Sequence, residues 1–270
     1  MFGHLIYSYN HLDDARIQQE ISRSLYSTKF NGVKVVHAHN GKASFGYKKY
    51  LEDVLIKRRN LGHFEGAADL IDSGMDWFIK NKIKSLRYVM VTAADTWCLN
   101  VNWIEGLIKE MEAKGQVVAC SSWGHVKAPE KPTGFSTDFF IVDLEWARAS
   151  KVFPLNYKKF KNSFQDVFLL NWSLPIVEAC FQYRYARYFM QVYKDNDVWM
   201  NRNKFWRRIS EREPVHVNGD RFSDWPKIGL YTSPEPLTKQ KALKALKINL
   251  GKYSDKLLKA KDLSYYNNHK

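Results

Sequence analysis

A hydrophobic strand pattern at residues 88–92 is followed, where the strand ends, by its first carboxylate, Asp95. Carboxylate oxygens are ligands of Mg²⁺ and Mn²⁺, and one or two of them suffice when phosphate oxygens and water complete the coordination sphere. Asp95 is therefore a candidate ligand of a divalent cation that bridges a diphosphate. The competing interpretation is that Asp95 caps the helix that follows it, a role that aspartate often fills.

Strand and helix patterns alternate on both sides of Asp95. Ile17, Ile21 and Leu25 recur at a four-residue spacing and predict a helix that begins at residue 13. Further helical patterns cover residues 62–80 and 103–114. Apolar or β-branched runs predict strands at residues 5–8, 33–39, 88–92, 116–120 and 139–142.

This alternation predicts an α/β fold with an open, mostly parallel sheet and helices on both faces. Ligands of such sheets bind beyond the carboxyl ends of the strands. The segments expected there are residues 8–10, 39–41, 92–96 and 121–125.

The composition narrows the class of protein. The 270 residues suit one large domain followed by a tail, and 45% hydrophobic residues exclude a disordered chain. Three widely spaced cysteines indicate neither a disulfide framework nor a zinc cluster, and no apolar run reaches the roughly 20 residues of a membrane span. The first ten residues lack the pattern of an export signal. We therefore expect a soluble, cytoplasmic protein.

The net charge of +14 indicates an anionic partner. Nucleic acid, an acidic membrane surface and a phosphorylated small molecule are the candidates. Residues 183–212 interleave arginines with aromatic residues, as single-stranded nucleic-acid binders do, but an amphipathic helical region with a solvated basic face explains the same pattern. Because no zinc-finger, RRM or KH signature is present, we do not expect nucleic acid as the partner.

Several short motifs follow one another between residues 5 and 170. Residues 7–10 (Tyr-Ser-Tyr-Asn) and 35–41 (Val-Val-His-Ala-His-Asn-Gly) end two strands, and residues 58–69 contain Asn60 and Gly62 before a helix. Residues 93–95 (Ala-Ala-Asp) end a third strand. In this order the motifs resemble those of the nucleotide-diphospho-sugar glycosyltransferases of the GT-A fold, particularly family 2.

The resemblance implies a site for a nucleotide-sugar donor. Asn40 stands where the family's second strand usually ends in Asp, and the Asn-x-Gly segment lies against the donor nucleotide in the family. Residues 93–95 fall on the Asp-x-Asp motif with its first Asp replaced by Ala93. The residues expected to contact the nucleotide sugar are Tyr9, Asn40, Arg59, Asn60, Gly62, Ala94 and Asp95.

The resemblance also implies a metal ion, Mn²⁺ or Mg²⁺. The last Asp of the family's motif is usually the direct ligand, which corresponds to Asp95. His216 is a candidate second protein ligand because some glycosyltransferases of this fold place a late histidine on the metal. A structural role for a lone histidine in an apolar stretch is the alternative.

Asp166 corresponds to the catalytic base that inverting members carry in a Glu-Asp motif, in which Gln165 here replaces the Glu. A sugar hydroxyl that attacks an anomeric carbon must lose its proton, and one carboxylate can accept it. The alternative is that Asp166 caps the helical pattern that follows. Gln165 and Trp123 are expected on the acceptor side, where Trp123 could stack on a sugar.

We therefore expect a catalytic domain at residues 1–236 and a basic amphipathic helical tail at residues 237–270. The tail has nine lysines and two aspartates, so it could hold the protein at the anionic inner face of the membrane, or its apolar face could pack on the domain. The expected activity is inverting transfer of a hexose to a hydroxyl of a glycan or lipid-linked acceptor, as in polysaccharide biosynthesis. A catalytically inactive GT-A-like binding protein is the main alternative.

Overall fold

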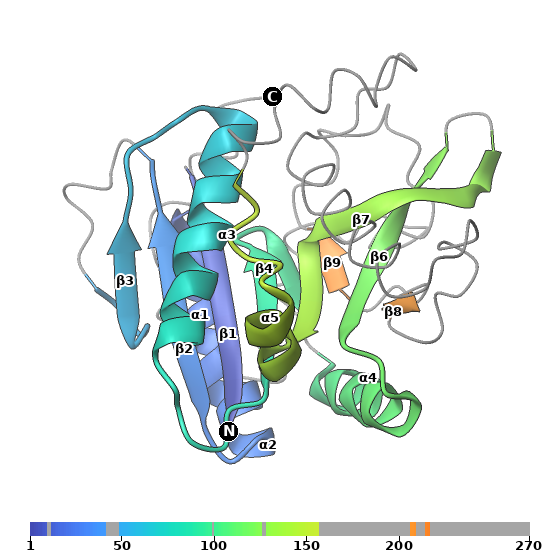
Figure 1. Ribbon diagram of the computed structural model, residues 1–270. Helices are drawn as coiled ribbons and strands as arrows, with labels where there is room; N and C mark the ends of the chain where they lie inside the picture. Colours follow the sequence, from blue (N-terminus) through green and yellow to red (C-terminus); the bar gives the residue numbers. More distant parts are fainter. Residues whose placement is uncertain are drawn as a thin grey trace.

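A computed structural model describes residues 1–9, 12–41, 49–98, 100–125, 128–156, 206–208 and 214–216. Figure 1 shows the chain with its elements labelled. In chain order they are β1 (Phe2–Ser8), α1 (Leu12–Ile21), the π-helical segment η1 (Ser22–Tyr26), α2 (Ser27–Lys29), β2 (Val33–His39), β3 (Val54–Lys57), α3 (His63–Lys80), β4 (Tyr88–Ala93), β5 (Thr96–Cys98), α4 (Val101–Lys114), β6 (Val118–His125), β7 (Ala128–Asp143), α5 (Leu144–Ser150), β8 (Trp206–Arg208) and β9 (Pro214–His216).

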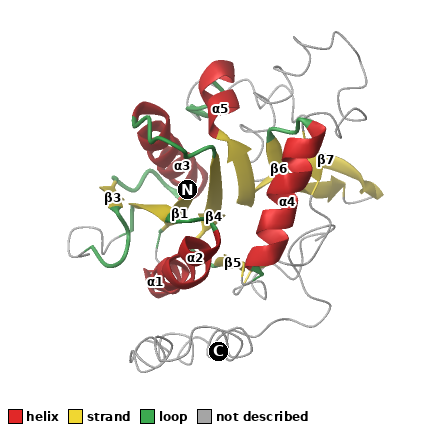
Figure 2. Ribbon diagram, turned by 90° about the horizontal axis from the view of Figure 1, so that it is seen from below, coloured by secondary structure: helices red, strands yellow, loops and turns green. Residues whose placement is uncertain are grey.

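One sheet of seven strands organises the described part of the chain, in the order β3-β2-β1-β4-β7-β6-β8. β1 pairs in parallel with β2 and β4, β2 with β3, and β6 with β8, whereas β7 is antiparallel to β4 and β6. Figure 2 shows α3 and α5 on one side of the strands and α1 and α2 on the other. The prediction of an open, mostly parallel α/β sheet with helices on both faces is confirmed.

Both faces of the central strands are buried because side chains alternate along a strand. Leu5, Val89 and Val91 pack in the core beneath α3, whereas Ile6 and Met90 pack in the core on the face of α1 and α4. A strand covered on both faces reads as an unbroken apolar run, which is why β4 was predictable.

Helix α3 approaches β1 at van der Waals distance. A Cβ atom on Gly74 would lie 2.2 Å from Leu5 Cδ1, so only glycine allows the helix to pack this closely on the strand. The close packing fixes the height at which α3 begins relative to the ends of the strands.

The helix predicted from residue 13 changes form at Ser22. The Ser22 hydroxyl donates to Gln18 O over 2.7 Å and lies 2.6 Å from His4 Nδ1. A serine hydroxyl that bonds the carbonyl four residues earlier competes with the backbone for it, and the helix widens to the π form at this residue. The sequence pattern carried no sign of this change.

Other elements were shorter in the prediction or absent from it. The strand predicted at 139–142 is the end of the 16-residue β7, which forms a long hairpin with β6. β3, β5 and α5 were not predicted, because they are short and give no clear period. The predicted tail, residues 237–270, lies outside the described residues.

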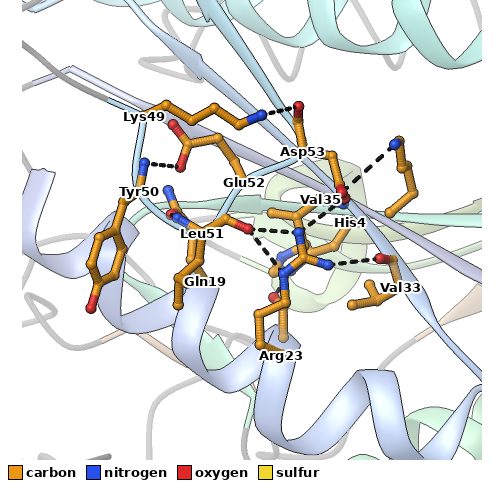
Figure 3. A network of polar contacts seen from close by, with 12 residues as sticks. His4, Gln19, Arg23, Val33, Val35, Lys49, Tyr50, Leu51, Glu52 and Asp53 are labelled. Atoms are coloured by element: carbon orange, nitrogen blue, oxygen red, sulfur yellow. Dashed lines mark hydrogen bonds and ion pairs between the residues drawn. The ribbon is translucent and has the colours of Figure 1, made fainter.

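Arg23 ties η1 to the segment that leads into β3, as Figure 3 shows. Its guanidinium donates to Leu51 O from Nε (2.9 Å) and Nη2 (2.6 Å) and to Val33 O from Nη1 (3.0 Å), and Nη2 lies 3.1 Å from Asp53 Oδ2. These contacts hold the edge strand β3 beside β2.

No helix in the described ranges combines the length and the apolar composition that crossing a membrane would require.

The face of the sheet under α1 contains a seam of polar side chains. Ser8 Oγ lies 2.8 Å from His37 Nε2 and 2.9 Å from His39 Nδ1, and His4 Nε2 lies 2.9 Å from Thr92 Oγ1. Burial lowers the pKa of His4 and the pKa of His37 to about 3. Both imidazoles are therefore neutral in the folded chain at neutral pH.

This burial predicts that stability falls in mild acid. The unfolded chain takes up protons on these histidines below about pH 6.5 while the folded chain does not, so the free energy of unfolding falls by about 1.4 kcal/mol per pH unit for each histidine as the pH drops from 6.5 towards 3. We expect His37→Gln to remove one of these contributions. Urea unfolding at pH 7.5, 6.5 and 5.5 measures it, and identical pH dependence in the variant and the wild type would contradict the assignment.

Candidate functional site

The carboxyl ends of four parallel strands lie at one edge of the sheet. β1 and β2 pair with Ser8 opposite His39, and β1 and β4 pair with Tyr7 opposite Ala93. Tyr9 and Asn40 directly follow β1 and β2, and the turn of Ala94 and Asp95 directly follows β4, the three strands being adjacent. Three of the segments that the sequence placed far apart thus meet at this edge.

The strand order reverses at this edge. From β1 the chain proceeds outward to β2 and β3, and it then returns to place β4 on the other side of β1. In open α/β sheets the crevice beside such a switch point is where ligands bind. Tyr9, 40% exposed, follows β1 at the switch point, and Asp95, partly buried, follows β4.

Asp95 occupies the turn between β4 and β5. Helix α4 begins at Val101, and its cap is Asn100, whose side chain accepts the N–H of Trp103 over 3.0 Å. The alternative in which Asp95 caps the following helix is therefore wrong. The carboxylate stands instead in a two-residue turn, Ala94 and Asp95, at the switch point.

Strand β9 brings the second predicted metal ligand to this turn. β9 pairs antiparallel with β5, and His216 lies opposite Thr96, the residue after Asp95. The two predicted ligands, 121 positions apart in the sequence (216 − 95), are thus neighbours in the backbone. The backbone of β9 is described, and the His216 side chain lies outside the described residues.

Asn40 is held in a small pocket between the end of β2 and the first turn of α3. Its side chain is 3% exposed, and a Cβ atom on Gly66 would lie 2.7 Å from Asn40 Nδ2. Asn60 Oδ1 lies 3.6 Å from the same position and accepts the N–H of Gly62 over 2.9 Å. Glycine is required at Gly66 because a Cβ atom there would collide with the Asn40 amide.

The Asn40 amide oxygen is buried and accepts no hydrogen bond from any described residue. Leaving a buried acceptor unpaired costs about 1–3 kcal/mol, so native structures rarely keep one without a reason. A ligand that donates an N–H would satisfy it.

The predicted donor segment also contains two arginines with different surroundings. Arg58 donates from Nε and Nη2 to the two oxygens of Asp69 on α3, at 2.7 and 2.6 Å, and these hydrogen bonds raise its pKa. Arg59 is exposed. The loop is thus anchored to α3 by Arg58, whereas the Arg59 side chain is exposed.

Helix α3 begins after Gly62, whose φ of 97° suits glycine and whose position has no side chain to cap the first N–H groups. The first N–H groups of α3 therefore have no side-chain cap at Gly62. Burial lowers the pKa of His39, at the end of β2, whose ring lies beside Ser8 Oγ on the opposite, α1 face of the sheet.

Three predicted residues cannot be placed in the site. Asp166 and Gln165 lie outside the described residues. Trp123 is on β6, with its side chain outside the described part. Their roles stay predictions.

Two residues near the site were not singled out from the sequence. Gly66 appeared only as part of a motif, because a glycine inside a helix gives no sign of what it faces. Gln18, on α1, contacts the Asp95 turn, and a glutamine in an amphipathic helix is normally read as a surface residue.

The side chains that could bind a metal ion at this turn form only part of a coordination shell for a hard cation. Asp95 supplies oxygen, and His216 could supply nitrogen, but no cluster of three His, Cys, Asp or Glu side chains occurs in the residues that the structure describes. A cation here would need oxygens of its ligand and water to complete its shell, as Mg²⁺ commonly does on phosphates. The residues fit a metal that arrives with a diphosphate.

No protein-family model and no curated protein matches the chain. Among solved structures, it is similar to the galactosyltransferase LgtC in complex with donor and acceptor sugar analogues (11% identity, TM-score 0.43, 88% of this chain and 99% of that one). It is similar to mouse xyloside xylosyltransferase 1 in its apo form (12%, 0.42, 82% and 99%). It is also similar to the glycosyltransferase GlyE of Streptococcus pneumoniae TIGR4 (10%, 0.40, 78% and 55%). All three of these proteins carry glycosyltransferase names.

The unpaired Asn40 oxygen leads to a prediction about stability. Asn40→Leu replaces a buried amide whose oxygen is unpaired by an apolar group of similar shape, so we expect the free energy of unfolding to stay equal or to rise by about 1 kcal/mol. The same change at the helix cap, Asn100→Leu, should lower it by about 1 kcal/mol. Urea unfolding of both variants is the measurement. A larger loss for Asn40→Leu than for Asn100→Leu would show that Asn40 is an ordinary structural residue.

Proposed function

We propose that this chain is a glycosyltransferase that transfers a hexose from a nucleotide-diphosphate sugar to a hydroxyl of a glycan or a lipid-linked acceptor, with inversion. The observation that carries the proposal is the meeting of the Asn40 pocket and the Asp95 turn at one switch point. The two lie on β2 and β4, two strand spacings or about 10 Å apart, with Tyr9 of the intervening strand between them. An extended nucleoside diphosphate can bridge that separation.

The arrangement assigns parts of the donor to parts of the edge. The nucleobase would enter beside Asn40, donate an N–H to its amide oxygen and stack on the exposed ring of Tyr9. Asn60, Gly62 and the exposed guanidinium of Arg59 would face the nucleotide from the start of α3. The diphosphate would then lie near Ala94 and Asp95. Asn40 can also donate, unlike the aspartate it replaces, so bases other than uracil could fit.

A divalent cation, Mn²⁺ or Mg²⁺, would be held by Asp95 and His216 and would stabilise the negative charge that develops on the diphosphate leaving group. Because Ala93 stands where the family's motif has a first carboxylate, we expect partial rather than complete dependence on the metal. The protein's part at this turn is to hold the Asp95 carboxylate at the end of β4.

In this proposal Asp166 removes the proton from the attacking acceptor hydroxyl. The described chain reaches Asn156, whose N–H donates to Asp72 Oδ2 over 3.0 Å, nine residues along α3 from His63. Nine helical residues span about 14 Å, and the ten residues from Asn156 to Asp166 can extend about 33 Å. The tether is therefore long enough for Asp166 to reach the site.

The acceptor would approach from the side of Trp123 and Gln165. A cytoplasmic location and a contact between residues 237–270 and an anionic membrane surface are part of the proposal, because a lipid-linked acceptor would be found there. The positive charge of the tail supports this part.

A thermal-shift screen of UDP, GDP, ADP, CDP and dTDP with Mn²⁺ tests donor binding. A ligand at about 100 times its Kd adds about 2.7 kcal/mol of stability, which raises Tm by several degrees. We expect Asp95→Asn to reduce the metal-dependent part of the rise and to keep the unliganded Tm. Asp76→Asn, which removes an exposed carboxylate on α3, is the matched control and should respond as the wild type does. An Asp95→Asn variant with an undiminished response to Mn²⁺ would exclude this carboxylate as the ligand.

The role of Asp166 is tested by transfer assays over a panel of nucleotide sugars and acceptors. Loss of a positioned general base typically lowers the rate by about 10² to 10⁴, whereas loss of a helix cap lowers stability by about 1 kcal/mol. We expect Asp166→Asn to fold and bind donor but to transfer very slowly. Near-normal turnover with a lowered Tm would favour the cap.

Two further outcomes of the same assays bear on the proposal as a whole. Donor binding without any transfer by the wild type would favour an inactive binding protein. NMR assignment of the product anomer tests inversion.

A further inference from the structure

Gln18 makes three hydrogen bonds to the hairpin that carries Asp95. Its side chain is 1% exposed and crosses from α1 to the end of β4. The amide nitrogen donates to Ala93 O over 2.6 Å and to Thr96 O over 2.5 Å, and the amide oxygen accepts the hydroxyl proton of Thr92 over 2.6 Å. Both N–H groups of one side chain are thus used on the two carbonyls that flank the turn.

The carbonyls of Ala93 and Thr96 stand at the two ends of the turn formed by residues 94 and 95. Because the Gln18 amide nitrogen binds both carbonyl oxygens, it fixes the distance between the two ends of the turn. Other contacts hold Ala94, whose N–H donates to Tyr7 O over 2.9 Å and whose carbonyl accepts from Trp97 Nε1 over 3.1 Å. Gln18 is the side chain that joins the residue before the turn to the residue after it.

A chain of buried hydrogen bonds fixes the orientation of the Gln18 amide. Because the Thr92 hydroxyl donates to Gln18 Oε1, His4 must donate to Thr92 Oγ1 from Nε2, 2.9 Å away. His4 Nδ1 lies 2.6 Å from the Ser22 hydroxyl, whose single proton can go either to this nitrogen or to Gln18 O. If the Gln18 amide were flipped, its oxygen would face two carbonyl oxygens and its nitrogen would face a hydroxyl that already has a donor. Only the observed orientation gives both backbone carbonyls, Ala93 O and Thr96 O, a donor.

We propose that Gln18 is a positioning residue for the cation site: by clamping the two ends of the turn it holds the Asp95 carboxylate where a divalent cation and a diphosphate can bind it. This inference rests on the proposed function, because it assigns Asp95 to the metal. Groups that orient metal ligands typically change metal affinity about 10- to 100-fold when they are lost.

The chain contains a matched control in the next residue. Gln19 is also on α1 and also buried, but its amide contacts the β2 side of the helix, accepting the N–H of Leu51 over 2.9 Å and lying 3.3 Å from His37 Nδ1. Gln18→Met and Gln19→Met therefore remove the same group from the same helix at the same depth. Only the first removes contacts with the Asp95 turn.

The measurement is the Mn²⁺ concentration that gives half of the maximal rise in Tm, in the presence of whichever of UDP, GDP, ADP, CDP or dTDP stabilises the full-length wild type most. Each variant is compared with its own Tm without Mn²⁺, so a general loss of stability does not alter the readout. We expect Gln18→Met to raise this concentration about 10- to 100-fold and Gln19→Met to change it less than about twofold. Asp95→Asn is the reference for loss of the ligand itself.

Two further variants keep the test decisive if Gln18→Met does not fold. Gln18→Glu keeps the size of the side chain and the acceptor for Thr92 but loses both N–H donors, and Thr92→Val removes the hydroxyl that orients the amide. We expect both to raise the Mn²⁺ requirement, Thr92→Val by the smaller factor.

The outcomes separate the inference from the proposed function. If Asp95→Asn weakens the Mn²⁺ response while the folded Gln18 variants respond as the wild type does, or Gln19→Met weakens it as much as Gln18→Met, the positioning role is wrong and the metal site stands. If Asp95→Asn leaves the response unchanged, or no nucleoside diphosphate stabilises the wild type, the proposed site itself is wrong, and with it the role of Gln18.

Discussion

The parallel pairing of β1 with β2 on one side and β4 on the other is the constraint on which the site depends. This pairing brings the residues that follow the three strands, Tyr9, Asn40 and the turn of Ala94 and Asp95, to one edge of the sheet. Side chains alternate between faces, so a shift of β2 by one residue would exchange the faces of His39 and Asn40. Asn40 would leave the pocket at Gly66, and a histidine would enter it. The candidate base pocket therefore exists in one register only.

The polar seam under α1 helps to specify that register. His4 and Ser8 on β1, His37 on β2 and Thr92 on β4 have hydrogen-bond partners in one another or in α1 and η1. Apolar side chains tolerate small shifts, whereas a buried polar group whose partner moves away loses a hydrogen bond at considerable cost. The strands and helix α1 must therefore meet in one relative position, and Gln18 transmits that position to the Asp95 turn.

Sequence reasoning found the large features of the fold because they follow from periodicity. The limits of β2 were predicted without error, and α3 was predicted within one residue, because their apolar and β-branched patterns are continuous. The π-helical segment at Ser22 could not be predicted, since it accompanies a turn of the Ser22 hydroxyl towards Gln18 O and His4, and His4 is 18 positions away. The short strand β5 depends likewise on its pairing with β9, more than 100 residues later.

The same distinction holds for the candidate site. Asp95 and Asn40 could be selected because they end strands, and the ends of parallel strands meet at one edge. Gly66 and Gln18 could not be selected, because what matters is the atom each one faces across the fold. The two faces of the sheet also differ in how their hydrogen-bond acceptors are paired, which only the three-dimensional structure shows. On the α1 side, Gln18 donates to the two backbone carbonyls that flank the Asp95 turn. On the α3 side, the buried amide oxygen of Asn40 is left unpaired beside Gly66. A site of the proposed kind, which binds a diphosphate through a cation and a base by direct hydrogen bonding, needs this asymmetry. The Asp95 turn must be held in shape before the ligand binds, whereas the Asn40 oxygen must stay unpaired so that the base can bind it.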